Sequence, residues 1–185
     1  MNEDSQIVKD VLEKKPGAFE NLVVRHKDLV WHITNRMLQN RESSADVFQD
    51  VFFQVYLKLG QFKNQSSLAT WIGRIAYNKA LRYLQKNRHT IYASENEANI
   101  NVCENDALNL DDVMIREEAT HLLLSGIQEL NPIERTVTSL YHIQELSIAE
   151  IATIFELPQG TIKSHLYRAR LNLKKKLSKS ILEML

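Results

Sequence analysis

The sequence is poor in the residues that make tight turns and cross-links. Its 185 residues include one cysteine, three prolines and five glycines. Cys103 can form no disulfide within the chain and has no CxxC partner. So few Gly and Pro residues leave little for the turns of a many-stranded sheet, whereas long stretches rich in Leu, Lys, Glu and Gln favour helices. We therefore predict an all-α fold.

Motifs of catalysis and of metal binding are also missing. The sequence contains no P-loop, GxGxxG, GxSxG or paired-carboxylate motif, and its six histidines show no HExxH or other metal-ligand spacing. We expect a protein that is not an enzyme, has no catalytic residues and uses no metal or other cofactor.

Long apolar runs are absent too. No window approaches the ~20 uninterrupted apolar residues that a membrane-spanning helix needs. The first residues, MNEDSQIVKDVLEKK, are polar and acidic where a secretory signal would be basic and then apolar. We expect no membrane insertion, no small-molecule substrate and a cytoplasmic location.

What the sequence does contain is charge separated into blocks. Lys+Arg and Asp+Glu number 23 each, so the formal net charge is zero. Residues 51–94 nevertheless carry seven Lys/Arg and no carboxylate, and residues 159–179 carry seven more and again no carboxylate. Between them, residues 95–118 carry eight carboxylates against Arg116 alone. Two basic segments therefore flank an acidic one.

The acidic segment also separates two helical parts. Residues 91–112 are rich in Asn, Asp and Glu and lack helical periodicity, which is typical of a solvated connection. We predict two small helical domains, residues 1–90 and 113–185, joined by an acidic linker over 91–112. Apolar residues at spacings of three and four predict helices in the first domain around residues 7–12, 19–37, 45–59 and 68–87.

The second domain shows clear helix-start signals. A helix is predicted over about residues 113–128. The next begins after Asn131, with Pro132 at its first position and Glu134 placed to reach back to the cap amide. A third opens on the capping box Ser147 to Glu150.

The last helix follows a short turn at Glu156-Leu157 and begins near Pro158. One stripe of it is apolar, and the remainder is cationic without a single anion. Such a helix repels itself unless a polyanion is present, so a merely solvated face is disfavoured. A capped helix, a short turn and a cationic helix together predict a helix-turn-helix whose second helix enters the major groove. The residues expected on the groove face are Lys163, Ser164, Tyr167 and Arg168, with His165 on the flank. Arg170, Lys174, Lys175 and Lys176 are expected to contact phosphates.

The segment LSIAEIATIFELPQGTIKSHLYRARLNLKKKL resembles the promoter-reading C-terminal domain of extracytoplasmic-function (ECF) sigma factors. Two positions depart from the usual family form. Glu156 stands where Gly is usual, so the turn either holds a non-Gly residue near positive φ or adopts another shape. His165 replaces a common Arg and, as a neutral imidazole, loses one fixed charge.

The first half resembles the same family's domain that binds polymerase and opens the promoter. The similarity lies in AFENLVVRHKDLVWHITNRML, SADVFQDVFFQVYLKLGQF and SSLATWIGRIAYNKALRYLQKNR, in that order. The spacing of the polar residues on the second of these segments is equally consistent with a face in water. The resemblance implies that this face docks on core RNA polymerase through Asp46, Gln49, Asp50, Phe53 and Gln54.

The resemblance also implies a site for the unpaired promoter strand. The loop Asn64, Gln65, Ser66 and Ser67 would capture a base of the minus-ten element, although Ser66 or Ser67 could also cap the next helix. Arg74, Lys79 and Arg82, together with Lys86 and Arg88, would follow phosphates. Asn78 could touch a base or cap a turn, and the spacing of Trp71 favours a place in the core over a stacking platform.

The resemblance thus implies a sigma factor whose partners are core RNA polymerase, promoter DNA and an anti-sigma factor. The C-terminal half alone leaves a dimeric helix-turn-helix repressor or activator as an alternative. That alternative predicts tight operator binding by the isolated protein, whereas a sigma factor depends on core polymerase. A separate hypothesis is that the eight carboxylates of residues 95–118 compete with DNA for the flanking cations.

Overall fold

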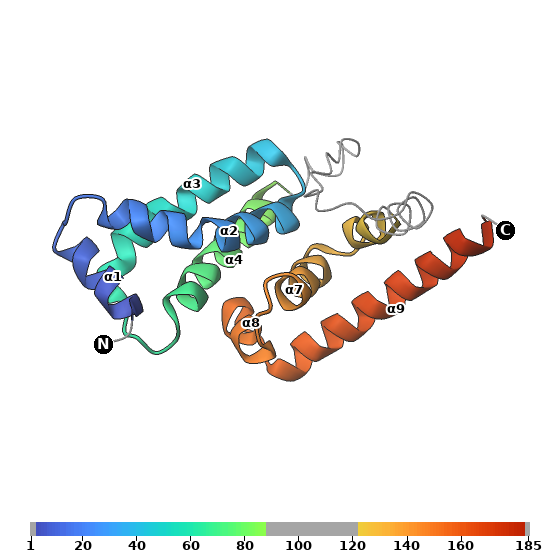
Figure 1. Cartoon of the computed structure of the whole chain (residues 1–185). Helices are drawn as coiled ribbons and strands as arrows, with labels where there is room; N and C mark the ends of the chain where they lie inside the picture. Colours follow the sequence, from blue (N-terminus) through green and yellow to red (C-terminus); the bar gives the residue numbers. More distant parts are fainter. Residues whose placement is uncertain (1–2, 88–121, 184–185) are drawn as a thin grey trace, which may run out of the picture.

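The computed structural model describes residues 3–87 and 122–183, with side chains described as far as residue 178. All regular structure in these ranges is helical, and the helices form two small domains packed against each other (Figure 1). The fold class is confirmed. The predicted acidic linker, and with it the charge-masking hypothesis, lies outside the described residues.

The N-terminal domain contains four α-helices and one short 3-10 turn, as the periodicity predicted. Its elements are α1 Glu3–Leu12, α2 Ala18–Leu38, α3 Arg41–Lys58, η1 Leu59–Gln61 and α4 Leu68–Lys86. Helix α3 begins at Arg41 rather than at Ala45, because the Asn40 side chain accepts a hydrogen bond from the Ser43 amide at 2.8 Å and caps the helix there.

The C-terminal domain contains α7 Pro132–His142, α8 Ile148–Phe155 and α9 Gln159–Glu183, preceded by helical residues 122–128. The earlier part of the helix predicted over 113–128 lies outside the described residues. The capping box at Ser147 and Glu150 is confirmed. The similar expectation for Glu134 is wrong: Asn131 caps α7, but the Glu134 carboxylate lies 3.3 Å from Arg168 Nε on α9.

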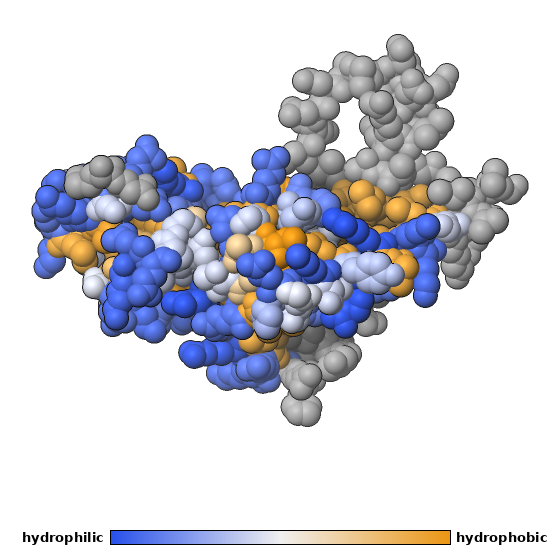
Figure 2. Space-filling view, turned by 90° about the horizontal axis from the view of Figure 1, so that it is seen from below, coloured by the Kyte–Doolittle hydropathy of each residue, from blue (hydrophilic) through white to orange (hydrophobic). Residues whose placement is uncertain are grey.

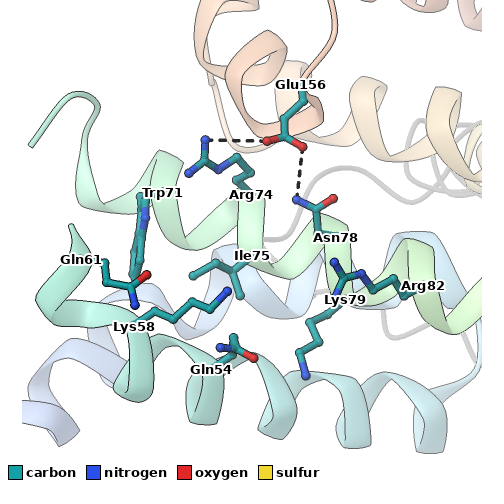
Figure 3. Close-up of a pocket in the computed structure, with 10 residues that line it drawn as sticks. All are labelled: Gln54, Lys58, Gln61, Trp71, Arg74, Ile75, Asn78, Lys79, Arg82 and Glu156. Atoms are coloured by element: carbon teal, nitrogen blue, oxygen red, sulfur yellow. Dashed lines mark hydrogen bonds and ion pairs between the residues drawn. The ribbon is translucent and has the colours of Figure 1, made fainter. Parts of the chain in front are cut away.

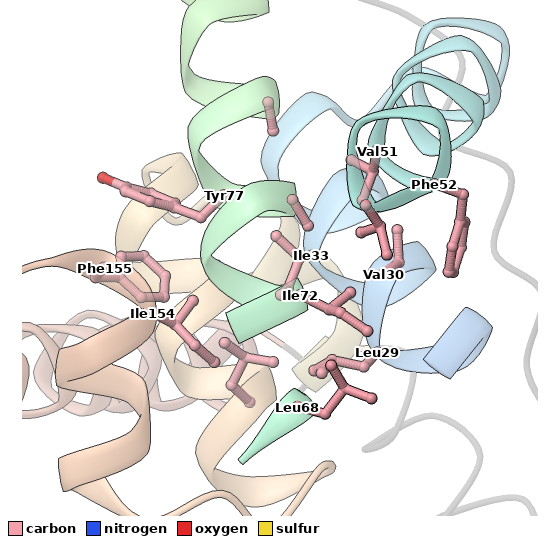
Figure 4. Close-up of a cluster of buried hydrophobic side chains, with 14 of the residues drawn as sticks. Leu29, Val30, Ile33, Val51, Phe52, Leu68, Ile72, Tyr77, Ile154 and Phe155 are labelled. Atoms are coloured by element: carbon pink, nitrogen blue, oxygen red, sulfur yellow. The ribbon is translucent and has the colours of Figure 1, made fainter. Parts of the chain in front are cut away.

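The two domains share one continuous apolar core (Figure 4). Within the first domain Val30, Val51 and Ile72 join α2, α3 and α4 and are fully buried. The core then continues through α4 into α8, where Ile154 and Phe155 are equally buried. Burying each such side chain contributes about 1.5–3 kcal/mol, so the domains do not separate without cost.

Close packing at the domain boundary depends on a glycine. A Cβ atom at Gly73 on α4 would lie only 3.0 Å from Cδ1 of Ile154, so the Ile154 side chain would have to shift by a few tenths of an ångström to make room for it. One turn further on, the rings of Tyr77 and Phe155 lie with their centroids 4.3 Å apart. The absence of a side chain at Gly73 is what leaves room for Ile154 at this depth.

A second contact between the domains is polar. Arg135 of α7 is buried and donates to three carbonyls: Arg36 O at the end of α2 at 2.5 Å, Gln128 O at 2.6 Å and Leu130 O at 3.1 Å. Burial lowers the pKa of Arg135 to about 10, with the charge of Arg36 adding to the effect. The guanidinium still stays charged at neutral pH, where it suits carbonyls at the C-terminal end of a helix.

The outer surface is mostly hydrophilic. On the face drawn in Figure 2, hydrophilic residues dominate and the apolar residues lie in a band across them. No helix within residues 3–87 and 122–183 is long and apolar enough to cross a membrane.

Two histidines of α2 sit in apolar surroundings. His26 is buried and His32 is half-buried, and the Nε2 atoms of both have no hydrogen-bond partner among the described residues. Burial is the main cause that lowers the pKa of both imidazoles. The unfolded chain therefore binds protons at these positions more readily than the folded one.

We predict that acidification from pH 7.5 to 5.5 lowers the free energy of unfolding. The loss begins as the pH falls below the unfolded pKa near 6.5, at up to about 1.4 kcal/mol per pH unit for each histidine. His26→Gln should reduce this loss, whereas the exposed His142→Gln should not. Urea unfolding at both pH values measures this loss in the free energy of unfolding. An equal loss in wild type and in His26→Gln would contradict the prediction.

Candidate nucleic-acid interface

The predicted helix-turn-helix is present in the C-terminal domain. Helix α8 ends at Phe155, the turn runs through Glu156 to Pro158, and α9 follows. The apolar stripe of α9 is buried at Ile162, Leu166 and Ala169. The exposed side chains on the other side include the residues predicted to face the groove, Lys163, Ser164, Tyr167 and Arg168, and the predicted phosphate contact Lys175.

Glu156 adopts the first of the two shapes expected for its turn, the left-handed conformation, with φ 55° and ψ 37°. Its amide donates to Ala152 O and closes α8. A residue with a Cβ pays about 1 kcal/mol or more for this conformation, which glycine would avoid. The turn therefore carries backbone strain that a glycine at this position would remove.

His165 lies on the flank of α9 and not on its open face. Only 14% of its side chain is exposed, and its Nδ1 atom is 3.9 Å from the carboxylate of Glu134 and 3.1 Å from a terminal nitrogen of Arg168. Burial, and then the charge of Arg168, lower the pKa of His165, while Glu134 partly offsets them. The imidazole is neutral at pH 7, so this position carries no fixed charge.

The Glu134 carboxylate also forms an ion pair with Arg168, and sequence patterns did not predict this contact. The Glu134 side chain is only 6% exposed, and its carboxylate forms an ion pair with the Nε atom of Arg168 at 3.3 Å. The two residues lie on α7 and α9, too far apart in sequence for periodicity to relate them. The ion pair directs one predicted base-reading side chain.

The outer face of α3 has the pattern predicted for a docking surface. Asp46, Gln49, Asp50 and Phe53 are exposed, and Phe53 is 65% exposed. The opposite side of the helix is buried in the core at Val47, Val51 and Val55. Gln54 is half-buried and turns instead towards the groove between α3 and α4. An exposed aromatic ring among acids and amides is typical of an interface anchor with a polar rim.

A groove of about 370 Å³ lies along α4, facing α3, and Glu156 from the turn of the helix-turn-helix reaches it beside Arg74 and Asn78 (Figure 3). It brings together four residues predicted to bind the unpaired strand, Arg74, Asn78, Lys79 and Arg82. The remaining lining residues are Gln54, Lys58, Gln61, Trp71, Ile75 and Glu156. Cations, amides and one indole ring suit a nucleic-acid strand, since phosphates need charge and bases need stacking or hydrogen bonds.

Three features of this groove were not predicted. Lys58 and Gln61 come from the end of α3 and from η1, and only the fold places them beside α4. Trp71 packs on Phe62 with ring centroids 5.5 Å apart, but it is half-buried and also lines the groove, so its expected place in the core is only part of its environment. Lys79 pairs with Asp50 at 3.3 Å across the groove.

The loop before α4 holds the other predicted strand-binding residues. Asn64 and Gln65 are exposed, and Asn64 has φ 53°, a conformation that Asn tolerates. Ser67 caps α4 by accepting a hydrogen bond from the Thr70 amide at 3.1 Å. Half-buried Ser66 bonds only to the Ser67 carbonyl, at 3.3 Å. Of the two serines, Ser67 is the cap.

Metal ligands do not gather anywhere in residues 3–87 and 122–183. No group of three or more His, Cys, Asp or Glu side chains there could hold a metal ion.

Two family models match the chain. The model described as Sigma-70 region 2 matches residues 22–90, and that described as Sigma-70, region 4 matches residues 120–173. The chain is 31% identical over 173 residues to the ECF RNA polymerase sigma-E factor of Escherichia coli (strain K12), covering 90% of each protein. It is 30% identical over 175 residues to the RNA polymerase sigma-H factor of Pseudomonas aeruginosa, covering 91% of this chain and 90% of the relative.

Solved structures share the fold at lower identity. CnrH, in complex with the cytosolic domain of CnrY, superposes with a TM-score of 0.67 at 21% identity, covering 96% of this chain and 99% of the other. The sigma factor RpoE, in complex with the anti-sigma factor NepR from Bartonella quintana, gives a TM-score of 0.67 at 19% identity, covering 88% and 98%.

The cluster around Glu134 yields a prediction. Glu134→Gln should lower the pKa of His165 further, because the carboxylate that favours the imidazolium is gone. It should also cost up to about 1 kcal/mol of stability, since Arg168 loses the negative charge with which it pairs, whereas the amide oxygen of Gln can still accept a hydrogen bond. NMR titration of the imidazole protons and urea unfolding measure the two effects.

Glu150→Gln is the matched control, because Glu150 occupies the same third position of α8 and takes part in a capping box. It should leave the pKa of His165 unmoved and change stability little, because Gln can complete the same capping box. An unchanged pKa in Glu134→Gln would show that the carboxylate does not act on this histidine.

Proposed function

The chain belongs to the ECF family of RNA polymerase sigma factors, and from that premise we propose which surface performs each step of initiation. As a sigma factor the protein directs core RNA polymerase to promoters. The alternative of a dimeric helix-turn-helix regulator is not favoured, because the family match extends over both domains. The proposed working units are residues 1–90 and 113–185, connected by the linker 91–112.

The outer face of α3 is the proposed docking surface for core polymerase. Asp46, Gln49, Asp50 and Phe53 present one aromatic ring within a polar and acidic rim, and Gln54 stands at its edge. What supports this assignment is that Phe53 is exposed together with Tyr56 and Leu57, three and four residues further along α3, since grouped apolar side chains on a surface mark a contact site more than a single one does.

The groove along α4 is the proposed site for the unpaired minus-ten strand. Arg74, Lys79 and Arg82 would follow the phosphates, and Asn78 would meet a base edge. Trp71 offers a ring at the groove wall, and the loop Asn64, Gln65, Ser66 and Ser67 would hold a base that has left the stack. A base that stacks in such a site gains about 1–3 kcal/mol, which offsets the few kcal/mol of unstacking, so the strands can part without ATP.

Helix α9 is the proposed reader of the minus-thirty-five element in duplex DNA. Its open face carries Lys163, Ser164, Tyr167 and Arg168, with the neutral His165 on the flank and Lys175 further along. The single observation that best supports the whole assignment is that these cations and the groove cations belong to separate domains. One protein can then hold paired and unpaired DNA together.

Three further properties belong to the proposal. The protein catalyses no reaction itself, and the polymerase performs phosphoryl transfer. It works in the cytoplasm, where core polymerase is found. An anti-sigma factor holds it inactive; RpoE, a protein of the same fold, has been crystallised with such a partner. The primary test is transcription by the purified chain with core polymerase on a pool of promoter fragments, which would also supply the promoter used below.

Phe53→Ala tests the docking surface. We expect the affinity for core polymerase to fall by about thirtyfold, the effect of removing a ~2 kcal/mol hot-spot side chain, with little change in stability. Val24→Ala is the control, because Val24 is another exposed apolar residue, on α2, at 55% exposure. Fluorescence titration of labelled protein with core measures both, and equal affinities would remove Phe53 from the interface.

A pair of variants tests the division between duplex and strand. In the holoenzyme, Lys163→Ala should weaken binding to a duplex containing only the minus-thirty-five region, by about tenfold if a base contact is lost. Arg82→Ala should weaken binding to the single-stranded minus-ten region and lower its salt slope by about one. Each variant should bind the other DNA probe with unchanged affinity. The assignment would be contradicted if either variant weakened binding to the other variant's probe, or to both probes equally.

A further inference from the structure

The turn of the helix-turn-helix lies on the groove of the other domain. Helix α8 packs along α4, and its last residue is followed by Glu156, whose carboxylate lines the groove (Figure 3). One oxygen of Glu156 is 3.7 Å from Arg74 Nη1, and the other accepts from Asn78 Nδ2 at 3.5 Å. Arg74 and Asn78 are two of the groups that the proposed function assigns to the DNA strand.

The packed arrangement places the turn over the groove along α4 and leaves the outer face of α3 and the open face of α9 exposed. Helix α8 is held against α4 by buried Ile154 and by the Tyr77–Phe155 ring pair, so the turn cannot leave the groove unless these apolar contacts break. Phe53 on the docking face and Tyr167 on α9 are 65% and 66% exposed in the same structure. Polymerase docking and duplex reading are therefore compatible with this arrangement, whereas Glu156 already contacts two of the groups assigned to the strand.

We propose that the Glu156 carboxylate occupies a phosphate position in the groove, so that the helix-turn-helix turn and the unpaired DNA strand compete for Arg74 and Asn78. The free protein is then closed over its strand-binding groove. It opens when polymerase and duplex DNA draw the two domains apart. This inference rests on the proposed role of the groove and adds to it the residue of the other domain that competes with the strand there.

The identity of residue 156 supports a role beyond making the turn. Glycine would adopt the same φ without strain, yet the chain carries a glutamate in the left-handed conformation. Its backbone position aims the side chain across the domain boundary at a cation and an amide donor. Glu145, a second exposed glutamate at φ 53° in the turn before α8, is absent from the groove lining and makes no ion pair within the described residues.

That pair of glutamates supplies a matched experiment. Glu156→Gly and Glu145→Gly each remove one negative charge and one strained conformation, but only the first removes a groove contact. The probe is a fluorescein-labelled single-stranded DNA of twelve random nucleotides at low salt, with the free full-length chain. Energy transfer between dyes at Asp28→Cys on α2 and Asn172→Cys on α9, in a Cys103→Ser background, reports the separation of the domains.

We expect Glu156→Gly to bind the oligonucleotide about two- to fivefold more tightly, the range for a solvent-exposed pair, and to show lower energy transfer before DNA is added. Wild type should reach the lower value only when the oligonucleotide is added, because competition is reciprocal. Glu145→Gly should match wild type in both measurements.

Three results would overturn the proposal. Equal gains in Glu156→Gly and Glu145→Gly would indicate an effect of net charge alone. No change in either measurement for Glu156→Gly would show that the contact does not hold the domains. Lower energy transfer without tighter strand binding would show that the turn does not cover the strand site. The Arg82→Ala holoenzyme assay decides independently whether the groove binds DNA at all.

A charge exchange tests the contact directly without reference to DNA. Arg74→Glu and Glu156→Arg should each lower the energy transfer of the free protein, since each places like charges together. The double variant should restore it, because the pair is re-formed with its signs reversed. Additive losses in the double variant would refute direct contact between these two side chains.

Discussion

The packing of α4 against three neighbours is the constraint on which the rest of the structure depends. Its residues from Leu68 to Ala80 bury one side against α2 and α3, and Gly73 and Tyr77 accept α8 from the other domain. The side that remains carries Arg74, Lys79 and Arg82. A single helix is thus at once a core element, a domain boundary and a row of cations, and a change on any side of it affects the other two.

The two domains present their cationic side chains in different ways. On α9 the positive side chains stand on an open face, and only Arg168 is directed, through a nearly buried carboxylate on α7. On α4 they line a groove, where Asp50 and Glu156 already occupy some of their hydrogen-bonding capacity. Duplex DNA requires an accessible helix that enters a groove, whereas a single strand requires a channel that excludes competing ligands until the strand is available.

Closure over that channel involves opposing terms of similar size. Apolar burial of Ile154 and Phe155 and the Arg135 contact with the end of α2 favour the packed arrangement. Polymerase and DNA oppose it by binding the opened form. A ligand shifts such an equilibrium only by its differential affinity for the two states. Weak, solvent-screened contacts at Glu156 suit a switch that polymerase must be able to reverse.

Sequence patterns alone determined much of this protein. The family resemblance left two shapes open for the turn at Glu156, one of them with positive φ. Few Gly and Pro residues and apolar spacings of three and four predicted the helices, and the Ser147 to Glu150 motif predicted the capping box, because these depend on neighbours within one or two turns. They failed for Glu134, where a local cap was expected and a residue of another helix, Arg168, took the carboxylate. The tertiary structure alone decided that Lys58 and Gln61 join the groove, that Trp71 stands at its wall and that Glu156 meets Arg74. Those contacts join residues far apart in the chain, and only the packing of buried side chains brings such residues together.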